Sequence, residues 1–113
     1  MKPLELYLHI PFCISKCKYC DFLSAPSEFQ ERQDYVESLC RDIRSYRNLA
    51  EAYVVVSIFL GGGTPSVLTP AQIKDIFKSI KETFQLSGEA EITIEMNPGT
   101  VDKEKLRTYR EVG

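Results

Sequence analysis

Apolar and polar residues alternate in two stretches of the chain, "LELYLHI" (residues 4–10) and "EAEITIEM" (residues 89–96). This period of two predicts strands with one apolar and one polar face. Tyr7 and His9 fall on the polar face of the first strand, and Glu95 falls near the end of the polar face of the other.

A continuous apolar run, "AYVVVSIFL" (residues 52–60), predicts a strand that is buried on both faces, as in a parallel sheet. Helical spacing of apolar residues follows each of the three strands, over residues 30–46, 70–88 and 101–112. In the second helix, Thr69 and Gln72 predict an N-terminal capping box, and Gly88 is expected to end the helix. The third helix is expected to turn Leu106, Tyr109 and Val112 inward.

The order of elements, three strands that alternate with three helices, predicts an α/β fold with parallel strands. Three such units do not close a barrel, so we expect residues 1–113 to be the N-terminal part of one β/α-barrel domain, without an internal boundary. The polar strand faces have two explanations. Tyr7, His9 and Glu95 either line the C-terminal mouth of the barrel, where such folds hold their sites, or they meet water on half-exposed strands.

The composition, 43% hydrophobic and 27% charged, is that of an ordinary globular protein. Fourteen basic and sixteen acidic residues give a net charge of −2, which does not favour nucleic acid as a partner. The sequence contains neither an apolar run of the roughly 20 residues that span a bilayer nor a signal peptide. We therefore expect a cytoplasmic protein, where clustered cysteines bind metal or do redox chemistry more often than they form disulfides.

Three of the four cysteines, Cys13, Cys17 and Cys20, lie within eight residues directly after the first strand. A disulfide would leave one thiol over, structural zinc would need His9 as a fourth ligand, and inert buried cysteines do not suit a lysine-rich loop. An iron–sulfur cluster suits the triplet best, because thiolates hold such clusters. Three thiolates on four irons leave one iron open to another ligand. Cys40 fits the apolar stripe of its helix and is expected in the core.

The spacing Cys13-x₃-Cys17-x₂-Cys20, with "GGGTP" after the next strand, resembles the signature of radical S-adenosylmethionine (SAM) proteins. "YLHIPFC", "FLGGGTPS" and "IEMNPGT" narrow the resemblance to the coproporphyrinogen-oxidase-like branch. The resemblance implies a radical SAM barrel in which the three cysteines hold a 4Fe-4S cluster. It also implies that the open iron binds S-adenosylmethionine, which the cluster cleaves reductively to a 5′-deoxyadenosyl radical.

The same resemblance implies that six further residues contact the cofactor: Tyr7, Tyr19, Gly62, Gly63, Thr64 and Glu95. It implies no catalytic residue among residues 1–113. Without the resemblance, the glycines also suit a tight turn and Glu95 also suits a surface carboxylate. Tyr7 would place its ring near the sulfonium, where an aromatic face attracts cations. His9 has two explanations, a residue that reaches the site or a hydrogen-bonded core residue.

Within the branch, an oxygen-independent coproporphyrinogen III oxidase and a heme chaperone are the candidates. The first strand begins near Leu4 without the oxidase's N-terminal extension, Phe22 stands where the oxidase carries a further cysteine, and "CDF" with "SAP" is similar to the chaperone's version. We therefore expect a protein that delivers heme to acceptor proteins, takes electrons from a donor and has its heme ligands outside residues 1–113. We expect residues 1–113 alone to be inactive. The oxidase and a structural zinc module stay open as alternatives.

Overall fold

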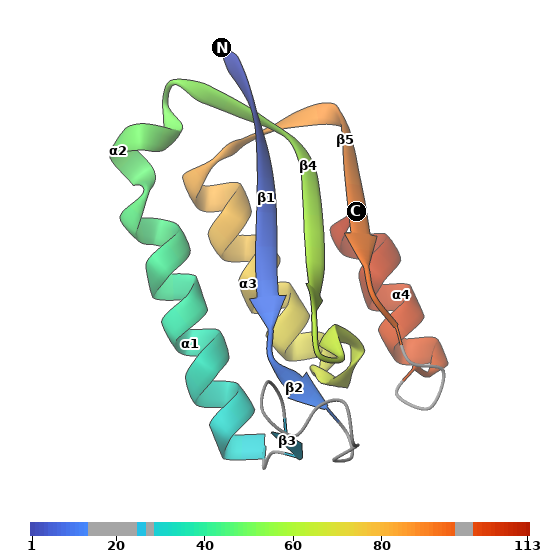
Figure 1. The fold of residues 1–113 in the computed structure, drawn as a ribbon. Coiled ribbons are helices and arrows are strands. Elements are labelled where there is room, and N and C mark those ends of the chain that lie inside the picture. The colour runs from blue at the N-terminus through green and yellow to red at the C-terminus, as the bar shows by residue number, and fades with distance from the viewer. Residues whose placement is uncertain (14–24, 27–28, 97–100) are drawn as a thin grey trace.

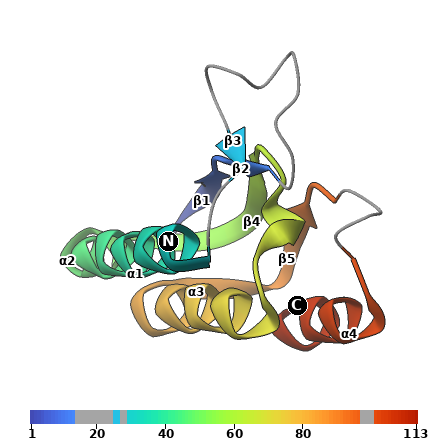
Figure 2. The same cartoon turned by 90° about the horizontal axis from the view of Figure 1, so that it is seen from below.

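The computed structural model describes residues 1–13, 25–26, 29–96 and 101–113. Its sheet has three parallel strands in the order β1 (Lys2–Ile10), β4 (Tyr53–Gly62) and β5 (Gln85–Ile94). The long helices α1 (Phe29–Ser45), α3 (Pro70–Thr83) and α4 (Lys103–Val112) lie in one layer on one face of the sheet (Figures 1 and 2). The predicted α/β fold with parallel strands is confirmed.

Four short elements complete the described part of the chain. They are β2 (Phe12–Cys13), which pairs in parallel with β3 (Ala25–Pro26), a one-turn helix α2 (Arg47–Ala50) and a 3₁₀ helix η1 (Pro65–Val67). The sequence analysis predicted none of these elements, because two to four residues are too short to show a period. None of the helices in the described ranges is long and apolar enough to cross a lipid bilayer.

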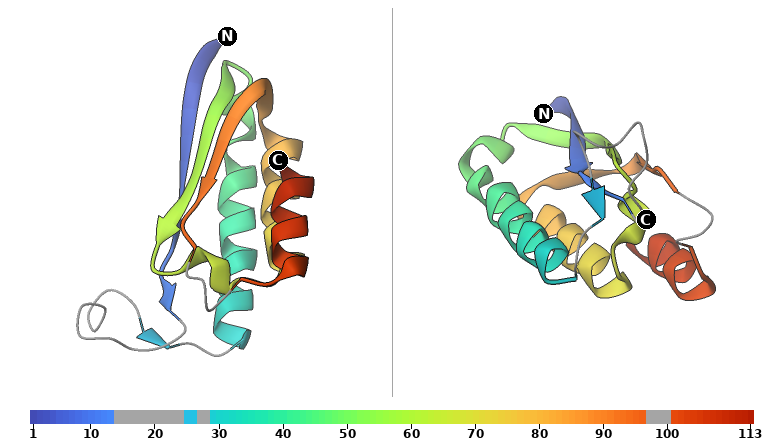
Figure 3. Two further views of the ribbon diagram at one scale, coloured as in Figure 1. Left: turned by 90° about the vertical axis from the view of Figure 1, so that its right-hand side faces the viewer. Right: turned by 60° about the horizontal axis from the view of Figure 1, so that its bottom comes forward.

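The core lies between the sheet and the helices. Leu8 and Ile10 of β1 are buried there with Ile58 and Leu60 of β4, against the isoleucines of α3. The opposite face of the sheet carries no helix in the described part of the chain, as the side view in Figure 3 shows. The alternation predicted for the first strand is therefore confirmed. The prediction that the apolar run is buried on both faces is wrong, since Phe59 lies on the open face and is 38% exposed.

The predicted capping box at the start of α3 is confirmed. The amide of Gln72 donates to Thr69 Oγ1 at 3.2 Å, and the amide of Thr69 donates to Gln72 Oε1 at 2.9 Å. The Gln72 side chain, 1% exposed, also donates from Nε2 to Gln33 Oε1 of α1 at 3.1 Å. One glutamine thus caps α3 and joins it to α1.

A Thr69→Ala variant is expected to lose about 1 kcal/mol of unfolding free energy, because it removes the acceptor for one amide of the first turn. Chemical denaturation of the full-length protein measures this loss. Thr69→Ser keeps the hydroxyl and is the matched control. Equal midpoints for the alanine and serine variants would contradict the role of the cap.

The end of α3 differs from the prediction. The helix stops at Thr83, and the buried Phe84 is already extended, with φ −113° and ψ 150°. Gly88 lies inside β5, where Leu86 pairs with Val55 while Glu91 pairs with Ser57. The extra residues of β5 form an irregularity in the ladder, and a glycine inside a strand commonly marks such a bulge. Gly88 therefore marks a strand bulge and not a helix end.

The inward face of α4 was predicted only in part. Tyr109 and Val112 pack against the core, but Leu106 is 49% exposed and Thr108 is buried at 3% exposure. The hydroxyl of Thr108 donates to the carbonyl of Glu104 at 3.0 Å, so this threonine can be buried without an unpaired polar group. Cys40 is 7% exposed within the core, which confirms the structural assignment made for it.

Candidate functional site

The carboxyl ends of β1, β4 and β5 meet at one edge of the sheet (Figure 1). On the open face near this edge, Tyr7, Phe59 and Thr93 lie in register across the three strands. The rings of Tyr7 and Phe59 stack, with centroids 5.8 Å apart and planes 15° from parallel. The Tyr7 hydroxyl lies 3.3 Å from His9 Nδ1, and Tyr7 is 58% exposed. The open face therefore offers an aromatic surface to a ligand.

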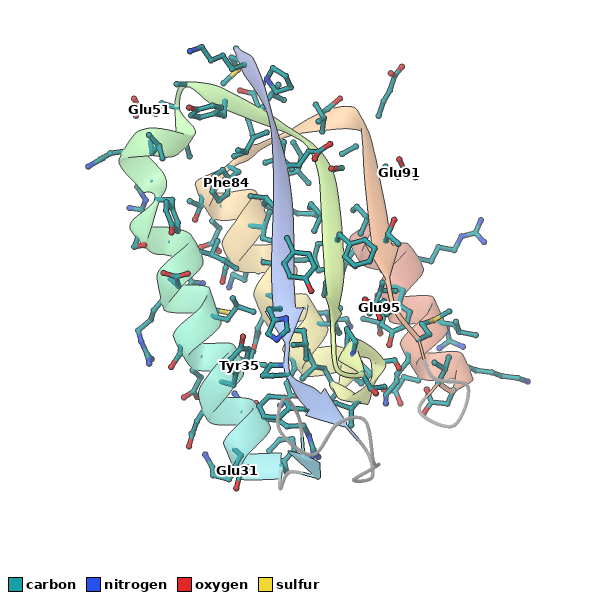
Figure 4. The ribbon with its side chains drawn as sticks, viewed as in Figure 1. Glu31, Tyr35, Glu51, Phe84, Glu91 and Glu95 are labelled. Carbon is teal, nitrogen blue, oxygen red and sulfur yellow. The ribbon has the colours of Figure 1, made fainter. Side chains whose placement is uncertain are left out.

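The next row toward the carboxyl edge contains His9, Gly61 and Glu95. His9 pairs with Gly61, and the amide of Glu95 donates to the carbonyl of Leu60 at 3.1 Å. A Cβ atom on Gly61 would lie 2.5 Å from Glu95 Oε1 and 2.6 Å from the Phe59 ring. The carboxylate of Glu95, labelled in Figure 4, thus lies directly over bare backbone. His9 is exposed on this face, which decides between its two explanations against the core residue.

Residues 61–64, called here the glycine strip, comprise the last two residues of β4 and the two that follow. They lie beside the segment that connects β1 to β2. The amide of Gly63 donates to the carbonyl of Ile10 at 2.8 Å, and the amide of Thr64 donates to that of Phe12 at 2.5 Å. Gly62 has φ +113°, a conformation that favours glycine. A Cβ on Gly63 would meet the Phe12 carbonyl oxygen at 2.5 Å. Side chains are therefore excluded where the glycine strip approaches β1 and β2.

Cys13, the first cysteine of the chain, is the residue after Phe12, whose carbonyl accepts from Thr64. Cys13 is the second residue of β2 and pairs with Pro26 of β3, so its backbone lies at the carboxyl edge of the sheet beside the glycine strip. Cys17, Tyr19 and Cys20 lie outside the described residues. The structure therefore brings Tyr7, the glycine strip, Glu95 and the backbone of Cys13 to one edge, and the meeting of the three thiols stays a prediction.

Two aromatic residues of this edge were missed by the sequence analysis. Phe59 stacks on Tyr7. Its place two residues before Gly61 in the same strand was a signal that could have found it. Tyr35 of α1, labelled in Figure 4, donates its hydroxyl to the carbonyl of His9. The rings of Tyr35 and Phe12 also meet edge to face. Burial, helped by the charge of Asp42, raises the pKa of Tyr35 above its ordinary value. No sequence pattern pointed to this tyrosine.

The comparison with known proteins identifies the family. The model of the radical SAM superfamily matches residues 7–113, nearly the whole chain. The chain belongs to the radical SAM superfamily. Membership in this superfamily implies in general a 4Fe-4S cluster and S-adenosylmethionine.

Named relatives within the radical SAM superfamily agree with the branch proposed from the motifs. Relatives named heme chaperone HemW include one from Buchnera aphidicola subsp. Schizaphis graminum at 40% identity and one from Escherichia coli at 39%. Both matches cover 100% of this chain and 30% of the relative. The solved structure of coproporphyrinogen III oxidase (HemN) from Escherichia coli, described as a radical SAM enzyme, matches with a TM-score of 0.89 and 34% identity over 99% of this chain and 26% of its own. The chain thus spans 30% of the length of these two heme chaperones and 26% of the oxidase chain.

Proposed function

We propose that this radical SAM chain is the cofactor-binding part of a heme chaperone, and that Cys13, Cys17 and Cys20 hold its 4Fe-4S cluster. Thiolates are the ligands that such clusters take. The observation that supports the location is the hydrogen bonding between the glycine strip and residues 10–12, which brings the backbone of Cys13 to the open carboxyl edge of the sheet. Residues 1–113 are, in this proposal, the N-terminal part of one domain.

The glycine strip and its neighbours fit S-adenosylmethionine, which we assign to Tyr7, Tyr19 and Glu95 together with Gly62, Gly63 and Thr64. A ligand that lies along the backbone needs positions without a Cβ, and Gly62, which is exposed at the end of β4, provides one. The Glu95 carboxylate suits ribose hydroxyls or the ammonium group. The exposed face of Tyr7 suits the sulfonium. Once bound, the cluster and S-adenosylmethionine supply radical chemistry, while these side chains orient the cofactor.

Delivery of heme is preferred over porphyrinogen oxidation for two reasons. The relatives named heme chaperone from Buchnera aphidicola and Escherichia coli are 40% and 39% identical to this chain, whereas the solved oxidase is 34% identical. In the sequence, Phe22 stands where the oxidase carries a further cysteine. We propose that heme passes to acceptor proteins in the cytoplasm, and that heme ligands lie outside residues 1–113.

One experiment separates the two activities. The full-length protein, reconstituted anaerobically with iron and sulfide, is incubated with coproporphyrinogen III, S-adenosylmethionine and a reductant, and porphyrins are separated by chromatography. We expect no decarboxylated product, and a parallel titration with heme is expected to give a stable Soret band. Formation of protoporphyrinogen would overturn the chaperone assignment in favour of the oxidase.

A further inference from the structure

The short segment between β1 and Cys13 is held from two sides. On the side of β4, the glycine strip donates two amide hydrogen bonds, to the carbonyls of Ile10 and Phe12. On the side of α1, the hydroxyl of Tyr35 donates to the carbonyl of His9. Three of the four residues directly before Cys13, namely His9, Ile10 and Phe12, thus accept a hydrogen bond at their backbone carbonyl.

The anchor from α1 satisfies a carbonyl that the sheet leaves unpaired. β1 is an edge strand of the described sheet, and its partner is β4. The carbonyl groups of neighbouring residues in a strand point to opposite edges. The Ile10 carbonyl accepts from Gly63 on the β4 side, so the His9 carbonyl points away from β4. Tyr35 reaches this outer edge from a helix that begins 19 positions after β1 ends, at Phe29.

The same tyrosine also holds the residue before Cys13. The Phe12 and Tyr35 ring centroids lie 5.3 Å apart at 86°, the edge-to-face geometry that aromatic pairs prefer. Phe12 in turn accepts the hydrogen bond of Thr64. Tyr35 therefore contacts the segment at both ends, through its hydroxyl at His9 and through its ring at Phe12.

We infer that Tyr35 is a positioning residue, which sets the direction in which the chain leaves β1 and thereby the place of Cys13 relative to the glycine strip and Glu95. Tyr35 belongs to α1 and contacts the segment and not the open face. Its effect on cofactor binding, as distinct from its effect on the segment, rests on the proposed function.

The first test needs no cofactor. Tyr35→Phe in the full-length protein keeps the ring and removes the hydroxyl. We expect the amide hydrogens of Gly63 and Thr64 to exchange about three- to tenfold faster, because their acceptors belong to the loosened segment. The matched control is Tyr109→Phe, since the buried Tyr109 hydroxyl has no hydrogen-bond partner in the described part of the chain. Unchanged exchange at both amides in Tyr35→Phe would overturn the inference.

The second test asks whether the segment positions the cofactor. With the cluster reconstituted, Tyr35→Phe is expected to bind iron to the parent level but to weaken S-adenosylmethionine affinity by about tenfold, as loss of an outer support commonly does at metal sites. The change in the electron paramagnetic resonance signal of the reduced cluster on titration with S-adenosylmethionine measures this affinity. Parental affinity in Tyr35→Phe would overturn the cofactor part of the inference. A parent protein that takes up no cluster would instead refute the proposed function, while the exchange experiment still decides the role of Tyr35.

Discussion

A Cys17→Ala variant of the full-length protein is expected to contain no 4Fe-4S cluster after anaerobic reconstitution. The proposed site has three protein thiolates, and each binds one iron, so removal of one leaves two irons without protein ligands. The measurement is the broad visible absorbance of the cluster, together with iron and sulfide content per chain. Cluster absorbance equal to that of the parent protein would show that Cys17 is not a ligand.

The fourth cysteine provides the control for this experiment. Cys40 lies in α1 within the core at 7% exposure, away from the carboxyl edge of the sheet. Cys40→Ala is expected to keep the full cluster and to lose a modest amount of unfolding free energy, because it leaves a small cavity. Loss of the cluster in both variants would indicate general damage to the fold and not removal of a ligand.

A Gly63→Ala variant is expected to lose about 1–3 kcal/mol of unfolding free energy, the usual cost of overpacking. Its new methyl group would lie 2.5 Å from the carbonyl oxygen of Phe12 and 3.0 Å from the Phe12 amide nitrogen. These are backbone atoms, so the segment before Cys13 must move away from the glycine strip. We therefore expect weaker binding of S-adenosylmethionine as well as a lower denaturation midpoint.

Gly88→Ala is the matched control for Gly63→Ala. No described atom lies within 4 Å of the place of a Cβ on Gly88, which is exposed in β5. Its alanine variant is expected to keep the unfolding free energy within about 0.5 kcal/mol and to bind S-adenosylmethionine like the parent. If the two alanine variants were equally stable, the close approach of the glycine strip to β2 would be refuted.

The sequence predicted those parts of the fold that depend on local pattern. Alternation in residues 4–10 placed Leu8 and Ile10 in the core, and the Thr69 capping box formed as its residue types required. The prediction was wrong where tertiary packing decided the outcome. Phe84 is buried in an extended conformation, so α3 ends before Gly88, and the sheet then continues with a bulge.

The candidate site was predictable to the extent that its residues follow strands. Tyr7, the glycine strip and Glu95 lie at carboxyl strand ends, where neighbouring parallel strands meet, and the structure brings them to one edge. Tyr35 was not predictable, because its contact with His9 joins residues 26 positions apart and depends on how α1 packs beside β1. The continuous apolar run of β4 did not show that Phe59 lies on the open face, nor that it stacks on Tyr7.

The central claim is that three thiolates hold a four-iron cluster with one iron open to S-adenosylmethionine. Its most direct test is anaerobic metal and sulfide analysis of the full-length protein, followed by electron paramagnetic resonance of the reduced cluster with and without S-adenosylmethionine. The account predicts about four irons and four sulfides per chain, and a signal that changes when S-adenosylmethionine binds. Zinc without iron or sulfide, or a cluster signal that S-adenosylmethionine leaves unchanged, would contradict it.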